Sequence, residues 1–347
     1  MNIGKEVRDC LISLRISSRD ARRRKVGDEE MLDELMDPYV VDSDVKIPGS
    51  KSFRRLPYKT QVFTGPRNVL VRNRLSHTEE VKSMAVRVAS ILGLNVNLTR
   101  AIAATHDIGH VPLGHTGEIF LSSVMDKKFR HEVFGAVLLQ KIERKGEGVN
   151  ATHQTLSGVR YHSRGKGKLT VCKEMSQEAV VVMYSDKFAY TTSDYNDISK
   201  RLNLPESWIR PVTLKINELG GNQRKREDTL IEALCADSFK LGRVGFVDSK
   251  VEEIFTEVKD LMYEIYPKIC INQPEESLDK IFCYLKNLFG KDKAMLVFAL
   301  MTDTDILPLM KKRVFDITDL ELTSIWEQKD YLLNLPPVDM CDPDLDW

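Results

Sequence analysis

The stretch over residues 105–118, THDIGHVPLGHTGE, constrains this chain more than any other part of it. Three glycines and a proline separate five ionisable side chains within these fourteen residues: His106, Asp107, His110, His115 and Glu118. Burying such groups without partners costs several kcal/mol each or forces them neutral, so this stretch is not part of an ordinary core. All seven histidines lie between His77 and His162. Imidazoles gathered so closely are typical of metal ligands and proton carriers, which predicts a functional site.

The composition is that of a globular protein, with 42% hydrophobic and 29% charged residues in 347. No run approaches the roughly 20 apolar residues of a membrane span, and the first residues contain no signal-peptide core, so we expect a cytoplasmic protein without membrane contact. The six cysteines form no CxxC pair, which predicts reduced thiols and no cysteine-based zinc site. The formal net charge of zero argues against broad electrostatic attraction to nucleic acid.

The hydrophobic pattern predicts an all-α fold, because apolar residues recur at helical spacing and no convincing alternating strand is present. We expect one helix that Gly93 ends, a second from about Leu98 that Gly109 ends, and a third over 130–144. The segment 176–198 begins with an apolar run and should form the central buried helix. Further helices are expected over 153–162, 225–241, 249–266, 275–289, 291–301 and 318–333.

This pattern divides the chain into four parts: a charged N-terminal extension (1–45), a helical core (46–204), a C-terminal helical part packed on the core (205–334) and an acidic tail (335–347). The cationic run over 22–25 is expected to be a solvated surface. The tail contains three prolines and four aspartates, which predicts a mobile segment.

Two histidines and two carboxylates form the predicted metal site. His77 is expected just before the first helix, and His106 and Asp107 on the last turn of the second. Asp186 follows the apolar string EAVVVMYS, where a carboxylate is costly unless it faces a cation or a metal. This mixed nitrogen and oxygen set suits Mn, Fe, Zn, Ni or Mg and leaves room for water and substrate.

Three further side chains follow on what we interpret as a loop. His115 and Glu118 would manage the proton of an attacking water or of a leaving group, and His110 would face substrate phosphates. His131 and His162 stay open between a supporting role behind the metal ligands and helix-end caps.

Several strings together resemble one family. RNRLSHTEEV, THDIGHVPLGHTGE and EAVVVMYSDKFAY, followed by Asp194, are similar to segments of the HD-domain deoxynucleoside triphosphate triphosphohydrolases, the dGTPase-like group. The similarity covers about residues 46–197 and implies an HD-domain helical fold with additional C-terminal helices. It also implies one divalent metal ion per site, with Mn favoured, and hydrolysis of a dNTP such as dGTP to deoxynucleoside and triphosphate. A homo-oligomer (dimer to hexamer) is implied as well, with single-stranded DNA or a regulatory dNTP as further candidate ligands.

The resemblance also implies a role for each site residue. Metal binding falls to His77, His106, Asp107 and Asp186, and catalysis at the α-phosphorus to His115 and Glu118, supported by His110. Substrate binding falls to Arg74, Lys187 and His110 at the triphosphate, Gln61 and Asp194 at the 3′-hydroxyl, Tyr190 against the sugar, and His131. Arg224 or Arg226 is a candidate for one more phosphate-binding arginine.

Two other hypotheses stay open. One is an HD-type nucleotidase or phosphodiesterase that acts on other nucleotides, which the stripe of Tyr190 and Asp194 at helical spacing disfavours. The other is a catalytically silent regulator that binds nucleotides or nucleic acid, which the zero net charge and the complete ligand set disfavour.

Overall fold

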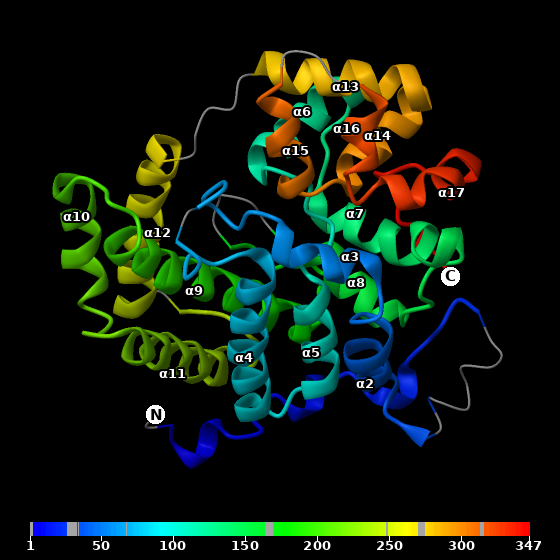
Figure 1. The fold of residues 1–347 in the computed structure, drawn as a ribbon. Helices are drawn as coiled ribbons and strands as arrows, with labels where there is room; N and C mark the ends of the chain where they lie inside the picture. Colours follow the sequence, from blue (N-terminus) through cyan, green and yellow to red (C-terminus); the bar gives the residue numbers. More distant parts are fainter. Residues whose placement is uncertain are drawn as a thin grey trace.

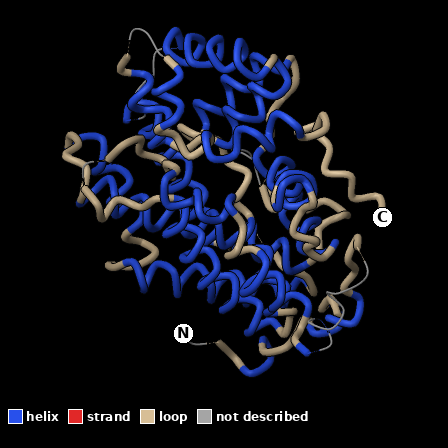
Figure 2. Tube along the Cα trace, turned by 45° about the vertical axis from the view of Figure 1, so that its right-hand side comes forward, coloured by secondary structure: helices blue, strands red, loops and turns tan. Residues whose placement is uncertain are grey.

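The computed structural model describes residues 3–25, 33, 35–66, 68–163, 169–247, 249–269, 275–312 and 316–347. Within these residues one isolated bridge joins Thr60 to Asn73 and there is no strand, so the predicted all-α fold is confirmed (Figures 1 and 2). The helices are α2 (Pro38–Val40), α3 (Lys51–Arg55), α4 (Arg74–Leu92), α5 (Val96–Thr105), α6 (His115–Met125), α7 (His131–Val137), α8 (His153–Tyr161), α9 (Gln177–Lys200), α10 (Glu206–Ile216), α11 (Gln223–Leu241), α12 (Lys250–Ile269), α13 (Glu275–Phe289), α14 (Lys291–Leu300), α15 (Asp303–Met310), α16 (Ile317–Glu321) and α17 (Lys329–Asn334).

Two hydrophobic cores organise these helices. The first joins α4, α5 and α9 to α10–α12, which lie on the left of Figure 1, through residues such as Val88, Val181 and Leu234. The second joins α6 and α7 to α13–α17 at the top of Figure 1, through residues such as Phe134 and Phe298. Each core therefore combines segments from both sides of residue 204, and α9 is the central helix of the first.

Some helices begin or end at residues other than those predicted, whereas others agree with the prediction. Gly93 ends α4 in the left-handed conformation, with φ of 78°, as expected. The same helix begins earlier than predicted, at Arg74, because Asn73 caps it, so that His77 lies within its first turn. α5 ends at Thr105, before a turn that leads to Gly109.

Other helices were missed or wrongly joined. The predicted helix over 318–333 is interrupted, since α16 and α17 are separate and a short 3-10 turn, Trp326–Gln328, precedes α17. α10 and α15 were not predicted, and proline inside each of them weakens the helical signal. α6 was interpreted as a loop because its approach is rich in glycine.

The prediction of a solvated surface over 22–25 is wrong for one of its residues. The side chain of Arg23 is 7% exposed and pairs with Asp42 at 2.9 Å and with Asp33. The side chain of Asp42 is fully buried and also accepts a hydrogen bond from the backbone N–H of Thr152 at 2.9 Å. Arg23 is drawn inside because Asp42 needs a cationic partner there.

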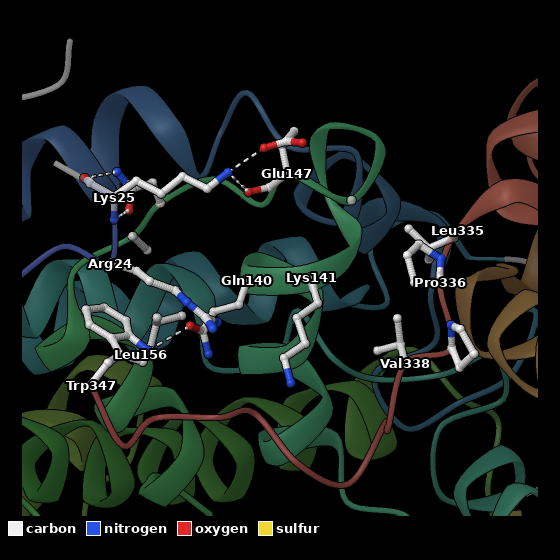
Figure 3. A pocket seen from close by; sticks show the side chains of 14 residues that line it. Arg24, Lys25, Gln140, Lys141, Glu147, Leu156, Leu335, Pro336, Val338 and Trp347 are labelled. Carbon is white, nitrogen blue, oxygen red and sulfur yellow. Dashed lines mark hydrogen bonds and ion pairs between the residues drawn. The ribbon is translucent and has the colours of Figure 1, made fainter. Parts of the chain in front are cut away.

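The acidic tail is packed on the protein, and the prediction of a mobile segment is wrong. Leu345 is buried in a third, smaller cluster with Leu139 and Leu156. The indole Nε1 of Trp347 donates a hydrogen bond to Gln140 Oε1 at 3.2 Å, and both side chains border the pocket in Figure 3. The many aspartates made the tail look mobile from its composition. Burial of its apolar residues nevertheless stabilises its packing on the protein.

We predict that Leu345→Ala lowers the free energy of unfolding by about 2 kcal/mol, because it removes buried methyl groups from the third cluster. The neighbouring exposed Asp346→Ala is the matched control and should change stability by less than about 0.5 kcal/mol. Urea denaturation followed by circular dichroism measures both, and equal midpoints would contradict the packed tail.

Candidate active site

The candidate site lies where the two cores meet. The first core brings side chains from α4, from the turn after α5 and from α9: His77, His106, Asp107 and Asp186. The second core brings side chains from the turn before α6, from α6 and from α7: His110, His115, Glu118 and His131.

The four predicted metal ligands converge. One ligand atom each from His77, His106 and Asp107 lies within 4.8 Å of the other two. Asp186 Oδ1 lies 3.1 Å from His77 Nε2, which adds the fourth side chain. All four are buried, so this cluster could hold a metal ion in a site closed on the protein side.

The hydrogen bonding of His106 and the burial of His77 favour the binding of a metal cation by these two histidines. His106 Nδ1 donates a hydrogen bond to the Ala103 carbonyl at 2.8 Å, which leaves the Nε2 lone pair as a donor for a metal. That Nε2 is buried and has no hydrogen-bond partner among the described residues. Burial lowers the pKa of His77, against the effect of Asp186, and so favours the neutral imidazole that a metal requires.

The two carboxylates of the cluster stay ionised. Burial alone would raise the pKa of Asp107, but the Arg74 guanidinium at 2.8 Å outweighs it and holds that pKa well below its ordinary value. Burial opposes ionisation of Asp186 in the same way, and Lys187 and His77 lower its pKa well below the ordinary range. Neutral imidazoles and ionised carboxylates are the forms that bind divalent metals.

A second group, Asp107, His110 and His131, also brings its ligand atoms within 4.8 Å of one another. The rings of His110 and His131 are stacked, with centroids 3.6 Å apart and planes at 17°. An imidazole binds a metal in its ring plane, and an ion between two stacked rings would lie outside both planes. This group is therefore better suited to carrying protons.

Glu118 joins the three histidines of that half of the site. Its carboxylate lies 2.8 Å from His131 Nδ1 and 3.2 Å from His115 Nδ1. His110 Nδ1 is 3.1 Å from Glu118 Oε1 but is not aligned for a hydrogen bond. The side chain of His115 is 72% exposed, so the predicted His115 and Glu118 pair is formed at the mouth of the pocket.

The ionisable side chains around Glu118 differ in charge near neutral pH. Burial opposes protonation of His131, but Glu118 and Glu132 raise its pKa to about 9. Burial opposes ionisation of Glu118, and the charge of His131 nevertheless lowers its pKa well below the ordinary value. Burial and the charge of Arg74 lower the pKa of His110 to about 4. Near neutral pH the group thus contains a His131–Glu118 ion pair beside a neutral His110.

Small residues allow the turn between α5 and α6 to close. A Cβ atom on Gly109 would lie 2.0 Å from the His131 carbonyl oxygen, so glycine is required where this turn meets α7. A Cβ atom on Gly117 would lie 2.0 Å from the Pro112 carbonyl oxygen. The close approach at Gly109 places His110 of the turn against His131 of α7.

A pocket of about 290 Å³ opens onto the cluster. It is lined by five of the predicted substrate-binding residues: Gln61, Arg74, His131, Lys187 and Tyr190. Both cations in this set reach the metal ligands, since Arg74 pairs with Asp107 at 2.8 Å and Lys187 with Asp186 at 3.3 Å. The buried Gln61 Oε1 has no hydrogen-bond partner among the described residues, which leaves an acceptor at the pocket.

The remaining predicted substrate residues do not line the pocket. Asp194 is 1% exposed, pairs with Arg72 and accepts a hydrogen bond from the Tyr266 hydroxyl at 3.0 Å. Arg226 donates to the carbonyl of Gly220, and the side chain of Arg224 is 91% exposed and faces Asp228. Neither arginine candidate lies at the pocket.

α12 supplies a wall of the pocket that was not predicted from the sequence. Tyr263 and Tyr266 line the pocket, and their ring centroids lie 5.9 and 5.0 Å from that of Tyr190. Their spacing of three residues, in the string YEIY, puts both rings on one helical face and was the available signal.

A family model and several known proteins are similar to this chain, and all of them point to the same family. The HD domain family model matches residues 74–191. A deoxyguanosinetriphosphate triphosphohydrolase-like protein of Clostridium tetani is 35% identical over 77% of this chain and 76% of its own length. Proteins described in the same words from Caldanaerobacter subterraneus subsp. tengcongensis and Desulfatibacillum aliphaticivorans are 33% and 39% identical, over 86% and 78% of this chain and 90% and 80% of their own lengths. None of the helices that the structure describes is both long and apolar enough to cross a bilayer.

We predict that Gly109→Ala destabilises the protein by about 3 kcal/mol, because the new methyl group forces α7 away from the turn. Gly221→Ala is the matched control, since its Cβ would meet nothing within 4 Å, and should change stability by less than about 0.5 kcal/mol. Thermal unfolding of the two variants compares them, and equal midpoints would refute the close approach.

Proposed function

The chain belongs to the deoxyguanosinetriphosphate triphosphohydrolase-like proteins of the HD domain family, and we propose that it hydrolyses a deoxynucleoside triphosphate to a deoxynucleoside and triphosphate. The observation that carries this proposal is the meeting of a buried cluster of four candidate ligands with a His–Glu proton-carrying group at one pocket. The HD domain and the relatives support a metal-dependent phosphohydrolase, and the dNTP substrate is the finer step that we propose.

His77, His106, Asp107 and Asp186 would hold the metal ion, with Mn²⁺ as our choice among the ions that suit a mixed nitrogen and oxygen set. A divalent ion held by these residues would supply a positive charge that polarises a phosphoryl oxygen and makes a water easier to deprotonate. The ionised carboxylates support this assignment, as does His106 Nε2, which has no hydrogen-bond partner in the part of the chain that the structure describes.

The pocket walls would bind the nucleotide. Arg74 and Lys187 offer cations to the triphosphate, helped by the neutral imidazole of His110. Gln61 Oε1 would accept the 3′-hydroxyl hydrogen, and the ring of Tyr190 would occupy the space that a 2′-hydroxyl needs. Asp194 would act on the sugar through the Tyr266 hydroxyl, which donates to it and keeps its own oxygen as an acceptor.

The His115 and Glu118 pair would carry the proton. A water oxygen forms the new bond to the α-phosphorus, the bond from phosphorus to the 5′-oxygen breaks, and the 5′-oxygen receives a proton. With its Nδ1 hydrogen bonded to Glu118, His115 would accept or donate that proton through Nε2. His131 would hold Glu118 from the other side, in a buried ion pair.

Oligomer formation and binding of a regulatory dNTP or single-stranded DNA remain proposals that rest on the family resemblance. Size-exclusion chromatography with light scattering, with and without mixed dNTPs, tests the first two together. A single monomeric species in both conditions would contradict oligomer formation and any dNTP binding that drives it.

The proposed reaction is tested by anion-exchange analysis of the products formed from each of the four dNTPs with Mn²⁺. We expect triphosphate and deoxynucleoside, and a rate reduced by more than about a hundredfold both on chelation of the metal and in Asp186→Ala. The exposed Asp292→Ala is the control and should keep the rate. Monophosphate products would favour the nucleotidase alternative, and full activity in metal-free buffer would exclude the metal assignment.

We further predict that Tyr190→Ala relaxes discrimination against ribonucleotides by at least about tenfold, because it opens space beside the sugar. Tyr190→Phe keeps the ring and should keep the discrimination. The ratio of kcat/KM for each dNTP to that for its ribonucleotide is the measurement. An unchanged ratio in the alanine variant would remove Tyr190 from this role.

A further inference from the structure

A carboxylate from the C-terminal helices ties together two loops of the pocket. Asp303, the first residue of α15, is 5% exposed. Its Oδ2 accepts hydrogen bonds from the backbone N–H of Thr60, at 2.8 Å, and from the Thr60 hydroxyl. Its Oδ1 accepts from the backbone N–H of Leu113 at 2.7 Å. One side chain thus binds residues that are 53 positions apart in the sequence.

The first of these loops supplies one wall of the pocket. Thr60, Gln61, Val62 and Thr64 all line it. Just before them, the ammonium of Lys59 donates to the carbonyl of His110 and so ties the same two loops a second time.

The second loop leads into the proton-carrying half of the site. Leu113 and Gly114 have φ of 61° and 54°, and the left-handed conformation is unfavourable for leucine. Gly114 is the N-cap of α6, whose first turn contains His115 and Glu118. The hydrogen bond from Leu113 to Asp303 therefore holds a strained residue at the point that determines where α6 begins.

The neighbouring carboxylate on α15 does not share this arrangement. Asp305 accepts from the N–H and hydroxyl of Thr302 and from the N–H and hydroxyl of Ser324. Its contacts stay within the C-terminal helices, whereas those of Asp303 reach the pocket.

We propose that Asp303 is a positioning residue for the site: it fixes the distance between the Gln61 wall and the first turn of α6. In this way the C-terminal helices hold His115 and Glu118 in place relative to the metal ligands of the first core. The effect on turnover rests on the proposed function, while the effect on the two loops does not.

The test compares Asp303→Ala and Asp303→Asn with Asp316→Ala. Asp316 caps α16 in the same group of helices through Thr318 and Asp319 and, among the described residues, contacts neither loop. Amide hydrogen exchange in the peptides 57–64 and 108–116 measures how firmly the two loops are held. Thermal unfolding compares the stability of the variants. Steady-state kinetics with Mn²⁺ and the best dNTP separates kcat from KM.

We expect Asp303→Ala to increase exchange in both peptides and to lower kcat by about tenfold to a hundredfold with a smaller change in KM. Asp303→Asn, which keeps one acceptor oxygen, should lie between this variant and the wild type. Asp316→Ala should lose stability but keep kcat within about threefold of the wild-type value.

Unchanged exchange in a folded Asp303→Ala protein, or a kcat as high as that of Asp316→Ala, would overturn the proposal. If the wild type hydrolyses no dNTP, the proposed function fails, and the exchange data alone still decide whether Asp303 holds the loops.

Discussion

The carboxylate of Asp107 is the interaction on which the rest of the site depends. It lies 2.8 Å from Arg74, 3.1 Å from His110 and 3.6 Å from His106, so it touches groups from both halves of the site. A buried carboxylate is tolerated only where cations and hydrogen-bond donors surround it. The need to satisfy this group explains why α4, the turn after α5 and the turn before α6 must all meet at one point. The local features that position these elements, such as the cap at Asn73 and the glycines of the turn, therefore also position the side chains of the site.

The sequence was sufficient for much of the fold and for the grouping of the predicted metal ligands. The long apolar run at the start of α9 indicates a buried helix, and Gly93 ends α4 for a local reason. His106, Asp107 and Asp186 could be grouped because buried ionisable residues in apolar surroundings need one another. These arguments depend on local chemistry, which is why the structure brings the same residues together.

Other features could not be predicted, because they depend on distant partners. Asp194 has the right spacing to face the pocket, yet Arg72 and Tyr266 hold it one layer behind the surface. The start of α6 depends on two left-handed residues and on a hydrogen bond to Asp303, which is 190 positions from Leu113. The tail appeared mobile from its aspartates, and only its neighbours show that Leu345 is buried. In each case the deciding contact is far away in the sequence.

The division of the site between two hydrophobic cores has a consequence for cooperativity. A nucleotide bound as proposed would contact Lys187 on the side of the first core and His115 on the side of the second, and so would bridge two hydrophobic cores that are separate. The binding free energy of the nucleotide would then strengthen the coupling between the two cores. The cores would unfold together, and under more strongly denaturing conditions than without the nucleotide. The proposed active site would thus connect the two cores, and we expect its occupancy to decide how independently the two cores unfold.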